Sequence, residues 1–145
     1  MSKVHASVVV GKPIEEVFDY AATPFNGPAF IPNLNENTNM IPTEVGKGQV
    51  FDWRFNMVGV DLRGKAEVAE FVRPNLVKIS STGDSDSMWT YTFEKEGGGT
   101  KVGVEIEYEF SETALKRLAN KVIVDKLAQK TAEQMCENLK LILEN

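Results

Sequence analysis

The side chains that could do chemistry in this sequence do not combine into a catalytic set. Acid–base catalysis needs a pair of ionisable groups that project into an apolar interior, where burial shifts their pKa values. Among the carboxylates of the strands predicted between positions 50 and 110, only Glu70 has the parity of the apolar residues. The opposite, polar face of the predicted strands holds Asp52, Arg54, Asp61, Arg63, Lys65, Glu67, Glu105, Glu107 and Glu109. The sequence therefore predicts no catalytic residue. This prediction holds if no β-bulge reverses the alternation of side chains along these strands.

The remaining reactive side chains also lack partners. His5 is the only histidine, so it cannot join a histidine-based metal site or a standard triad, and it has the parity of a surface residue. Cys136 is the only cysteine and has no adjacent histidine or basic pair to activate it. Asp84 and Asp86 are too few for the roughly six to eight oxygen ligands of calcium. The sequence therefore predicts neither a metal site nor a cofactor.

Aromatic and other large apolar residues share the opposite parity of the same strands. They are Trp53, Phe55, Met57, Leu62, Trp89, Tyr91 and Tyr108, and Met135 lies on the apolar stripe of the last predicted helix. Small-molecule cavities are mostly apolar and aromatic with a few polar tips, and buried tyrosine hydroxyls and indole N–H groups need partners. These residues either line such a cavity or fill a solid core, and both interpretations remain open.

The elements that position these residues follow from periodicity. Lys3–Val10 alternates as a strand, Pro13–Ala22 has helical spacing, and Phe25–Leu34 is interrupted by prolines and a glycine but is too apolar for a free loop. From Thr38 to Phe110 the period is two, which predicts an antiparallel sheet with one buried face. Turns are expected at Val58-Gly59, Pro74-Asn75, Gly83-Asp84 and Gly97-Gly98-Gly99.

A final helix is predicted from Ser111 to about Leu143. Its apolar residues lie on two sides, roughly 180° apart at about 100° per residue. One side holds Leu115, Leu118, Ala119 and Val122, and the other holds Val124, Leu127, Ala128, Met135, Leu139 and Ile142. A straight helix cannot bury both sides against one sheet, so we expect a break between Asn120 and Val124. The second part should lie on the sheet, which gives a single α+β domain over residues 1–145.

Composition restricts the partners. The net charge is −5, and no Lys/Arg cluster supplies the basic face that nucleic-acid binding needs. No run of about 18 apolar residues could form a transmembrane helix, and Met1–Val10 lacks the apolar core of a signal peptide. A single cysteine excludes an intramolecular disulfide. We expect a cytoplasmic protein that binds no nucleic acid.

Four segments resemble, in order, motifs of the SRPBCC superfamily, which includes START-type lipid carriers, birch-pollen-allergen-like proteins and polyketide cyclases/dehydrases. Ser7–Phe18 resembles the strand and P-x-E-x-V-[FW] opening of the family. Ala22–Leu34 resembles its second helix, with Phe30 where tryptophan is usual and Thr23 where aspartate is usual. The turn R-P-P-x-R-L-V is similar to Phe71–Val77, and the closing L-x-x-L-K is similar to the segment around Asn138-Leu139-Lys140.

This resemblance implies a helix-grip fold: a curved antiparallel sheet of about seven strands around the long C-terminal helix, with two short helices after the first strand. It also implies a cavity between the concave face of the sheet and that helix. Phe25 and Phe30 would lie at the opening of this cavity, either as a movable gate or as a fixed cap. Members of the superfamily bind lipids, polyketides, sterols, plant hormones or quinones, and a minority catalyse cyclisation or dehydration.

Three functions follow as hypotheses. The first is binding of a hydrophobic small molecule in a cavity of ~300–1,000 Å³. The second is a cyclase or dehydrase reaction in which Tyr91 or Tyr108 donates a hydrogen bond to a carbonyl group. The third is an accessory protein that docks on a larger enzyme through Leu115, Leu118 and Val122; the redirected apolar stripe also leaves a homodimer open.

Overall fold

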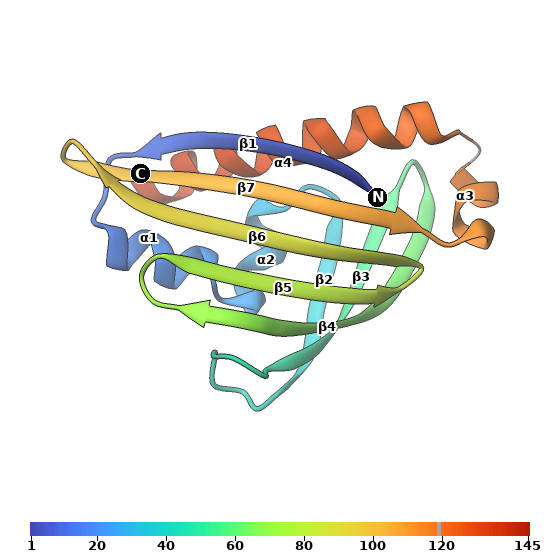
Figure 1. The fold of residues 1–145 in the computed structure, drawn as a ribbon, viewed down its shortest axis with the longest axis horizontal. Coiled ribbons are helices and arrows are strands. Elements are labelled where there is room, and N and C mark those ends of the chain that lie inside the picture. Colours follow the sequence, from blue (N-terminus) through green and yellow to red (C-terminus); the bar gives the residue numbers. More distant parts are fainter. Residues whose placement is uncertain (119) are drawn as a thin grey trace.

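A computed structural model describes residues 1–118 and 120–145, and Figure 1 shows how the elements are arranged. The strands are β1 (Ser2–Val10), β2 (Leu34–Ile41), β3 (Val50–Met57), β4 (Val60–Val72), β5 (Leu76–Gly83), β6 (Ser85–Glu96) and β7 (Gly99–Phe110). The helices are α1 (Ile14–Ala21), the short 3-10 helix η1 (Pro24–Asn26), α2 (Gly27–Phe30), α3 (Glu112–Leu118) and α4 (Lys121–Glu144).

The strands of the described residues form one antiparallel sheet in the order β1-β7-β6-β5-β4-β3-β2. Strands β2 to β7 follow one another as hairpin neighbours, and β1 pairs with β7 at the far edge. In Figure 1 the sheet curves, α4 runs behind β1 and β7, and α1 lies toward the end of the molecule that carries the C-terminus. The predicted α+β helix-grip fold, with its sheet of seven strands, is confirmed.

The hairpin between β3 and β4 turns where the sequence predicted it. Val58 and Gly59 have φ values of 51° and 81°. Positive φ at both central residues is the mark of a type I′ turn, whose twist matches that of the flanking strands. Gly97 also adopts a positive φ, 58°, in the predicted glycine turn before β7. These turns fix the register that carries alternate side chains of β3, β4, β6 and β7 to the inner face.

A bulge in β4 changes the position of the one carboxylate that the sequence placed on the inner face. The pairing of β4 with β5 shifts register between Val68 and Glu70. One extra residue reverses the alternation of side chains, so Glu70 is exposed and pairs with Lys78 on the outer face. Phe71 then turns inward and contacts Phe18. The inward position expected for Glu70 is therefore wrong.

The charged residues that the sequence assigned to the polar face lie on the outer face of the sheet. Lys65 Nζ lies 2.8 Å from Asp52 Oδ1, and Lys3 Nζ lies 3.7 Å from carboxylate oxygens of both Glu105 and Glu107. All of these groups are accessible to solvent, so the pairs contribute little to stability. Their main consequence is that charge stays away from the inner face.

The helical region at the C-terminus is interrupted, as its two apolar sides predicted. α3 ends at Leu118 and α4 begins at Lys121, so the break includes Asn120, the first residue of the interval in which it was expected. Ala119, which the sequence assigned to the first apolar side, lies outside the described residues. The buried side of α4 is formed by Val124, Ala128, Thr131, Ala132, Met135, Cys136 and Leu139.

Two apolar residues of this region do not lie where the helical pattern placed them. Val122 is 62% exposed and Ile142 is 38% exposed, so neither belongs to a buried side. Leu118 is buried and Leu115 is half-buried, so Leu115, Leu118 and Val122 do not form a common exposed face. The docking surface expected from these three residues is therefore not present, and the formation of a homodimer stays a prediction.

Asn120 caps the N-terminus of α4. Its Oδ1 accepts hydrogen bonds from the backbone N–H groups of Val122, at 2.8 Å, and Ile123, at 3.4 Å. Replacing Asn120 by alanine should lower the free energy of unfolding by about 1 kcal/mol, because two N–H groups of the first turn lose their acceptor. Urea denaturation measures this loss. Asn120→Asp keeps an acceptor and should retain most of the stability, whereas equal losses in both variants would contradict the capping role.

The apolar segment after α1 divides into exposed and buried parts. Phe25 in η1 is 76% exposed, whereas Phe30 at the end of α2 is 1% exposed. The expectation that Phe25 packs with the rest of the segment is therefore wrong. Ile31 is buried, and Leu34 begins β2 as a half-buried residue. Within the described residues, none of the helices has both the length and the apolar content needed to cross a membrane.

Candidate functional site

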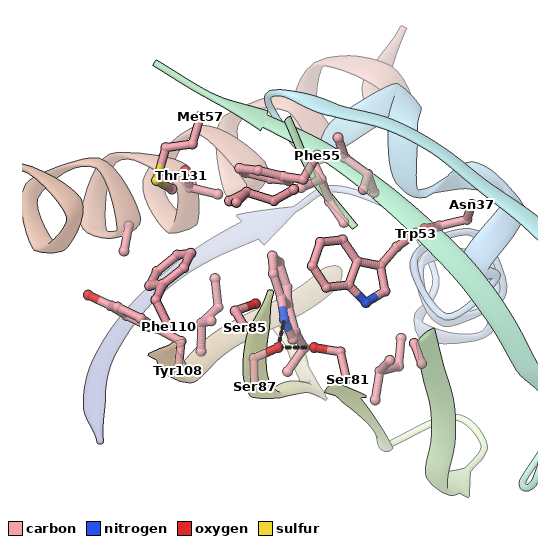
Figure 2. Close-up of a pocket in the computed structure, with 18 of the residues that line it drawn as sticks. Asn37, Trp53, Phe55, Met57, Ser81, Ser85, Ser87, Tyr108, Phe110 and Thr131 are labelled. Carbon is pink, nitrogen blue, oxygen red and sulfur yellow. Dashed lines mark hydrogen bonds between the residues drawn. The ribbon is translucent and has the colours of Figure 1, made fainter. Parts of the chain in front are cut away.

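A cavity of about 120 Å³ lies between the inner face of the sheet and α4, and Figure 2 shows its surroundings. Every strand except β1 contributes to its wall, as do α4 and Ile31, the residue that follows α2. The wall is aromatic and apolar over most of its area, with serine hydroxyl groups on one side. This is the position that the curved sheet and the long helix predicted.

Most of the residues that the sequence proposed as ligand contacts come together in this wall. They are Trp53, Phe55 and Met57 of β3, Leu62 of β4, Trp89 and Tyr91 of β6, and Tyr108 of β7. Phe30 and Met135 are not part of the wall, so we do not include them in the site. Phe30 packs against Tyr20 and Tyr91, with ring centroids 6.0 and 6.4 Å apart, and Met135 is fully buried in α4. Whether the seven wall residues contact a ligand stays a prediction.

Other residues of the wall did not appear among the predicted contacts. They are Ile31, Leu34, Asn37, Phe51, Ala66, Ile79, Ser81, Ser85, Ser87, Ile106, Phe110, Ala128 and Thr131. A signal for the serines was present in the sequence. Ser85 and Ser87 precede Trp89 and Tyr91 at alternate positions of one strand, and Ser81 follows Ile79 in the same way. Because side chains alternate with period two, these hydroxyl groups must share the inner face with the aromatic rings.

The two tryptophans of the chain both lie in the wall, and each indole N–H has a partner within the protein. Trp53 Nε1 donates to the backbone oxygen of Lys65 at 3.2 Å. Trp89 Nε1 donates to Ser87 Oγ at 2.8 Å. Buried indole N–H groups need such partners, and here both are satisfied within the protein. The chain therefore contains no tryptophan outside the site.

Three residues form a hydrogen-bonded group on one side of the cavity, which we call the polar corner: Ser81, Ser87 and the Trp89 N–H. Ser81 Oγ and Ser87 Oγ are hydrogen-bonded to each other, and Figure 2 shows the two side chains facing one another from neighbouring strands. Ser87 Oγ also accepts the Trp89 N–H. Ser85 lies beside this group in the wall, and its hydroxyl has no hydrogen-bond partner among the described residues.

No Asp, Glu, Lys, Arg or His side chain of the described residues lines the cavity. Tyr91 and Tyr108 are its ionisable groups, and burial raises the pKa of both phenols. The Tyr108 hydroxyl donates to Asp125 Oδ1 at 2.6 Å, and Figure 2 shows this hydroxyl directed away from the polar corner. The hydrogen bonds from Tyr108 and Lys121 hold the pKa of Asp125 below its usual range. The interior is therefore electrically neutral near pH 7.

The other residues with reactive side chains lie elsewhere. His5 is exposed on β1, and Cys136 is buried in α4, where burial raises the pKa of its thiol to about 11. Asp84 Oδ2 accepts the backbone N–H of Arg63 at 2.9 Å, as expected of a turn residue. In the part of the chain that the structure describes, no three His, Cys, Asp or Glu side chains gather as metal ligands would.

The cavity is smaller than expected. Pockets for drug-sized ligands span ~300–1,000 Å³, whereas this one has about 120 Å³. An engineered apolar cavity of roughly 150 Å³ in another protein stays dry and binds benzene. In this conformation the space suits a molecule with one aromatic ring, and a larger ligand would require the wall to move.

Comparison with known families finds one match that spans nearly the whole chain. The sequence profile of the family described as "Polyketide cyclase / dehydrase and lipid transport" matches residues 1–144. No curated protein matches the chain by sequence.

Solved structures with the same fold come from bacteria and plants. A protein from Thermus thermophilus has a TM-score of 0.82 at 23% identity, over 99% of this chain and 97% of that one. Ginseng major latex-like protein 151 from Panax ginseng has a TM-score of 0.71 at 15% identity, over 99% and 98% of the two chains. The di-domain ARO/CYC protein StfQ from the steffimycin biosynthetic pathway has a TM-score of 0.76 at 12% identity, over 98% of this chain and 50% of that one. At these identities the likeness concerns the fold alone.

Proposed function

Because this chain belongs to the polyketide cyclase/dehydrase and lipid transport family, we propose that it binds a small, uncharged and largely apolar molecule between the sheet and α4. One observation carries the proposal: the fold leaves a pocket whose wall is aromatic and apolar and, among the described residues, free of charged groups. Such a space excludes charged ligands, because a buried unpaired charge is strongly unfavourable.

The wall supports binding more than catalysis. Aldol-type ring closure or loss of water requires a base that removes a proton from the substrate. The ionisable groups of the wall are two phenols whose pKa values burial raises further, so both are protonated near pH 7. Tyr108 also uses its hydroxyl hydrogen on Asp125. A cyclase reaction would therefore have to proceed without a base from the described part of the wall.

Titration with toluene tests the proposal directly. Because both tryptophans lie in the wall, toluene should change the intrinsic fluorescence of the protein in a saturable manner. Ala128 of α4 also lies in the wall and is 8% exposed. A leucine at this position would fill much of the 120 Å³. Ala128→Leu should weaken toluene binding at least tenfold, because its side chain occupies the volume that the ligand needs.

Lys130→Leu is the matched control, since it places a leucine on the same helix at an exposed position. It should leave the dissociation constant of toluene unchanged. Filling a cavity commonly adds ~0.5–2 kcal/mol to stability, so Ala128→Leu should not lower the midpoint of urea denaturation. The proposal fails if toluene gives no saturable change and native mass spectrometry finds no bound apolar compound. It also fails if Ala128→Leu binds toluene as tightly as the unmodified protein.

A further inference from the structure

We propose that the cavity selects neutral ligands that carry a hydrogen-bond-accepting oxygen, such as a ketone, and that this oxygen binds at the polar corner. The inference rests on the proposed function, since it requires that a ligand enters the cavity, and it adds the chemical class of that ligand. It is based on the donors and acceptors of Ser81, Ser87 and Trp89.

The polar corner has one hydrogen more than it can use. The Trp89 N–H and the hydroxyl groups of Ser81 and Ser87 supply one hydrogen each. Trp89 donates to Ser87 Oγ, and one of the two serines donates to the other. Whichever serine is the donor, the hydroxyl hydrogen of its partner has no acceptor among the described residues. Three hydrogens and two internal bonds leave one donor free.

This free donor is shielded from bulk water. Ser81 and Ser87 are each 7% exposed, and both side chains belong to the wall of the cavity. A buried donor without an acceptor is unfavourable, and such donors are rarer in proteins than acceptors with a spare lone pair. An oxygen placed in the cavity next to the serine pair satisfies the donor. The apolar remainder of the ligand then lies against Trp53, Phe55 and Ile106.

Two of the other donors of the wall are already used within the protein. The Trp53 N–H is used on the backbone of Lys65, and the Tyr108 hydroxyl is used on Asp125. Asn37 donates through Nδ2 to the backbone oxygen of Pro24 at 2.8 Å. Asn37 Oδ1 is a buried acceptor without a partner among the described residues, so it does not offer a hydrogen to a ligand oxygen. The hydroxyl groups of Ser85, Tyr91 and Thr131 also lie in the wall and have no partner among the described residues. Ser85 adjoins the polar corner and therefore provides the nearest control for the assignment.

Acetophenone and α-methylstyrene form a suitable pair of probes. They have nearly the same shape and differ in a C=O group against a C=CH₂ group, so only acetophenone offers an accepting oxygen. Isothermal titration calorimetry gives the ratio of their affinities for each protein. Comparison of this ratio between two proteins cancels the different hydration of the two compounds, because the free ligands are the same in both titrations.

The triple variant Ser81→Ala, Ser87→Ala, Trp89→Phe removes all three donors together and so leaves no orphaned partner. It should lower the ratio of acetophenone to α-methylstyrene affinity about tenfold. Ser81→Ala alone should keep the ratio within about threefold, because Ser87 still accepts from Trp89 and retains its own hydrogen for the ligand. Ser85→Ala and Trp89→Phe alone should also keep it, since neither removes the last free donor of the corner.

The outcomes separate this inference from the proposed function. If neither compound binds the unmodified protein, the proposed function fails and this inference fails with it. If both bind and the triple variant leaves the ratio unchanged, the cavity binds ligands but the polar corner does not select them. A ratio that falls in Ser85→Ala and not in the triple variant assigns the donor to Ser85 and overturns the inference.

A second measurement needs no triple variant. The two tryptophans give two indole N–H signals in a ¹H–¹⁵N spectrum, and Trp89→Phe assigns them. Acetophenone should shift the Trp89 signal more than α-methylstyrene does, because a new bond at the serine pair alters the oxygen that accepts the Trp89 hydrogen. Equal shifts of the Trp89 signal with both compounds would contradict binding of the oxygen at the polar corner.

Discussion

Replacing Phe18 by alanine should lower the free energy of unfolding by about 3–5 kcal/mol, the usual loss for a buried phenylalanine. Phe18 in α1 is 0% exposed. Its ring makes edge-to-face contacts with Phe71 of β4 and Phe93 of β6, at centroid distances of 5.2 and 5.1 Å. Removal of the ring opens a void between α1 and the sheet that its neighbours can only partly fill. Since small domains are stable by about 5–15 kcal/mol, urea denaturation should show a large shift of the midpoint.

Phe25→Ala is the matched control for Phe18→Ala. Both residues belong to the short helices after β1, but Phe25 is 76% exposed. Its replacement should change the free energy of unfolding by no more than about 0.5 kcal/mol, as is usual at the surface. Phe18 is not part of the cavity wall, so Phe18→Ala should still bind toluene under conditions in which it is folded. Similar losses of stability in the two variants would contradict the assignment of Phe18 to the core.

Gly64→Ala should have the second-largest effect, and it should act on the cavity as well as on stability. Gly64 in β4 faces Trp53 across the β3–β4 pair. An added Cβ would lie 2.5 and 2.7 Å from Trp53 Cζ2 and Cε2, and it would also clash with the backbone oxygen of Thr82. Overpacking of this kind costs about 1–3 kcal/mol, and the value should lie at the upper end because backbone atoms are involved.

The clash at Gly64 should also displace the Trp53 ring, which forms part of the cavity wall. We therefore expect a changed fluorescence spectrum and weaker toluene binding in Gly64→Ala. Gly46→Ala is the control, since an added Cβ there meets no atom within 4 Å and the glycine does not need a left-handed conformation. Gly46→Ala should leave stability and binding essentially unchanged. An unaltered spectrum in Gly64→Ala would contradict the close approach of Trp53 to the backbone.

The small volume of the cavity connects these variants to function. A space of about 120 Å³ holds little more than one ring, so each side chain of the wall takes a large share of what a ligand could occupy. A leucine at position 128 removes this space, and a displaced Trp53 reshapes it. Variants that alter the wall should therefore reduce ligand affinity more than core variants elsewhere that lower the free energy of unfolding by the same amount.

Local sequence patterns were enough to predict the strands, their inner face and most of the wall. Side chains of a strand alternate by local backbone geometry, so the parity of Trp53, Trp89 and Tyr108 can be read without knowledge of the fold. Turn residues such as Gly59 and Gly97 are also local, because they meet a need for positive φ. The two apolar sides of the C-terminal region predicted a break near Asn120 for the same reason.

Features that depend on several strands at once could not be predicted from the sequence. The bulge that exposes Glu70 arises from the pairing of β4 with β5, and the spare hydrogen of the polar corner arises because Ser81 and Ser87 meet across two strands. Exposure of Phe25 and burial of Phe30 depend on where the short helices lie. The volume of the cavity is a small difference between the space that the curved sheet encloses and the volumes of the side chains that fill it. The alternation of side chains along each strand predicts which residues line the cavity. The volume of the cavity, in contrast, depends on the position of every neighbouring side chain.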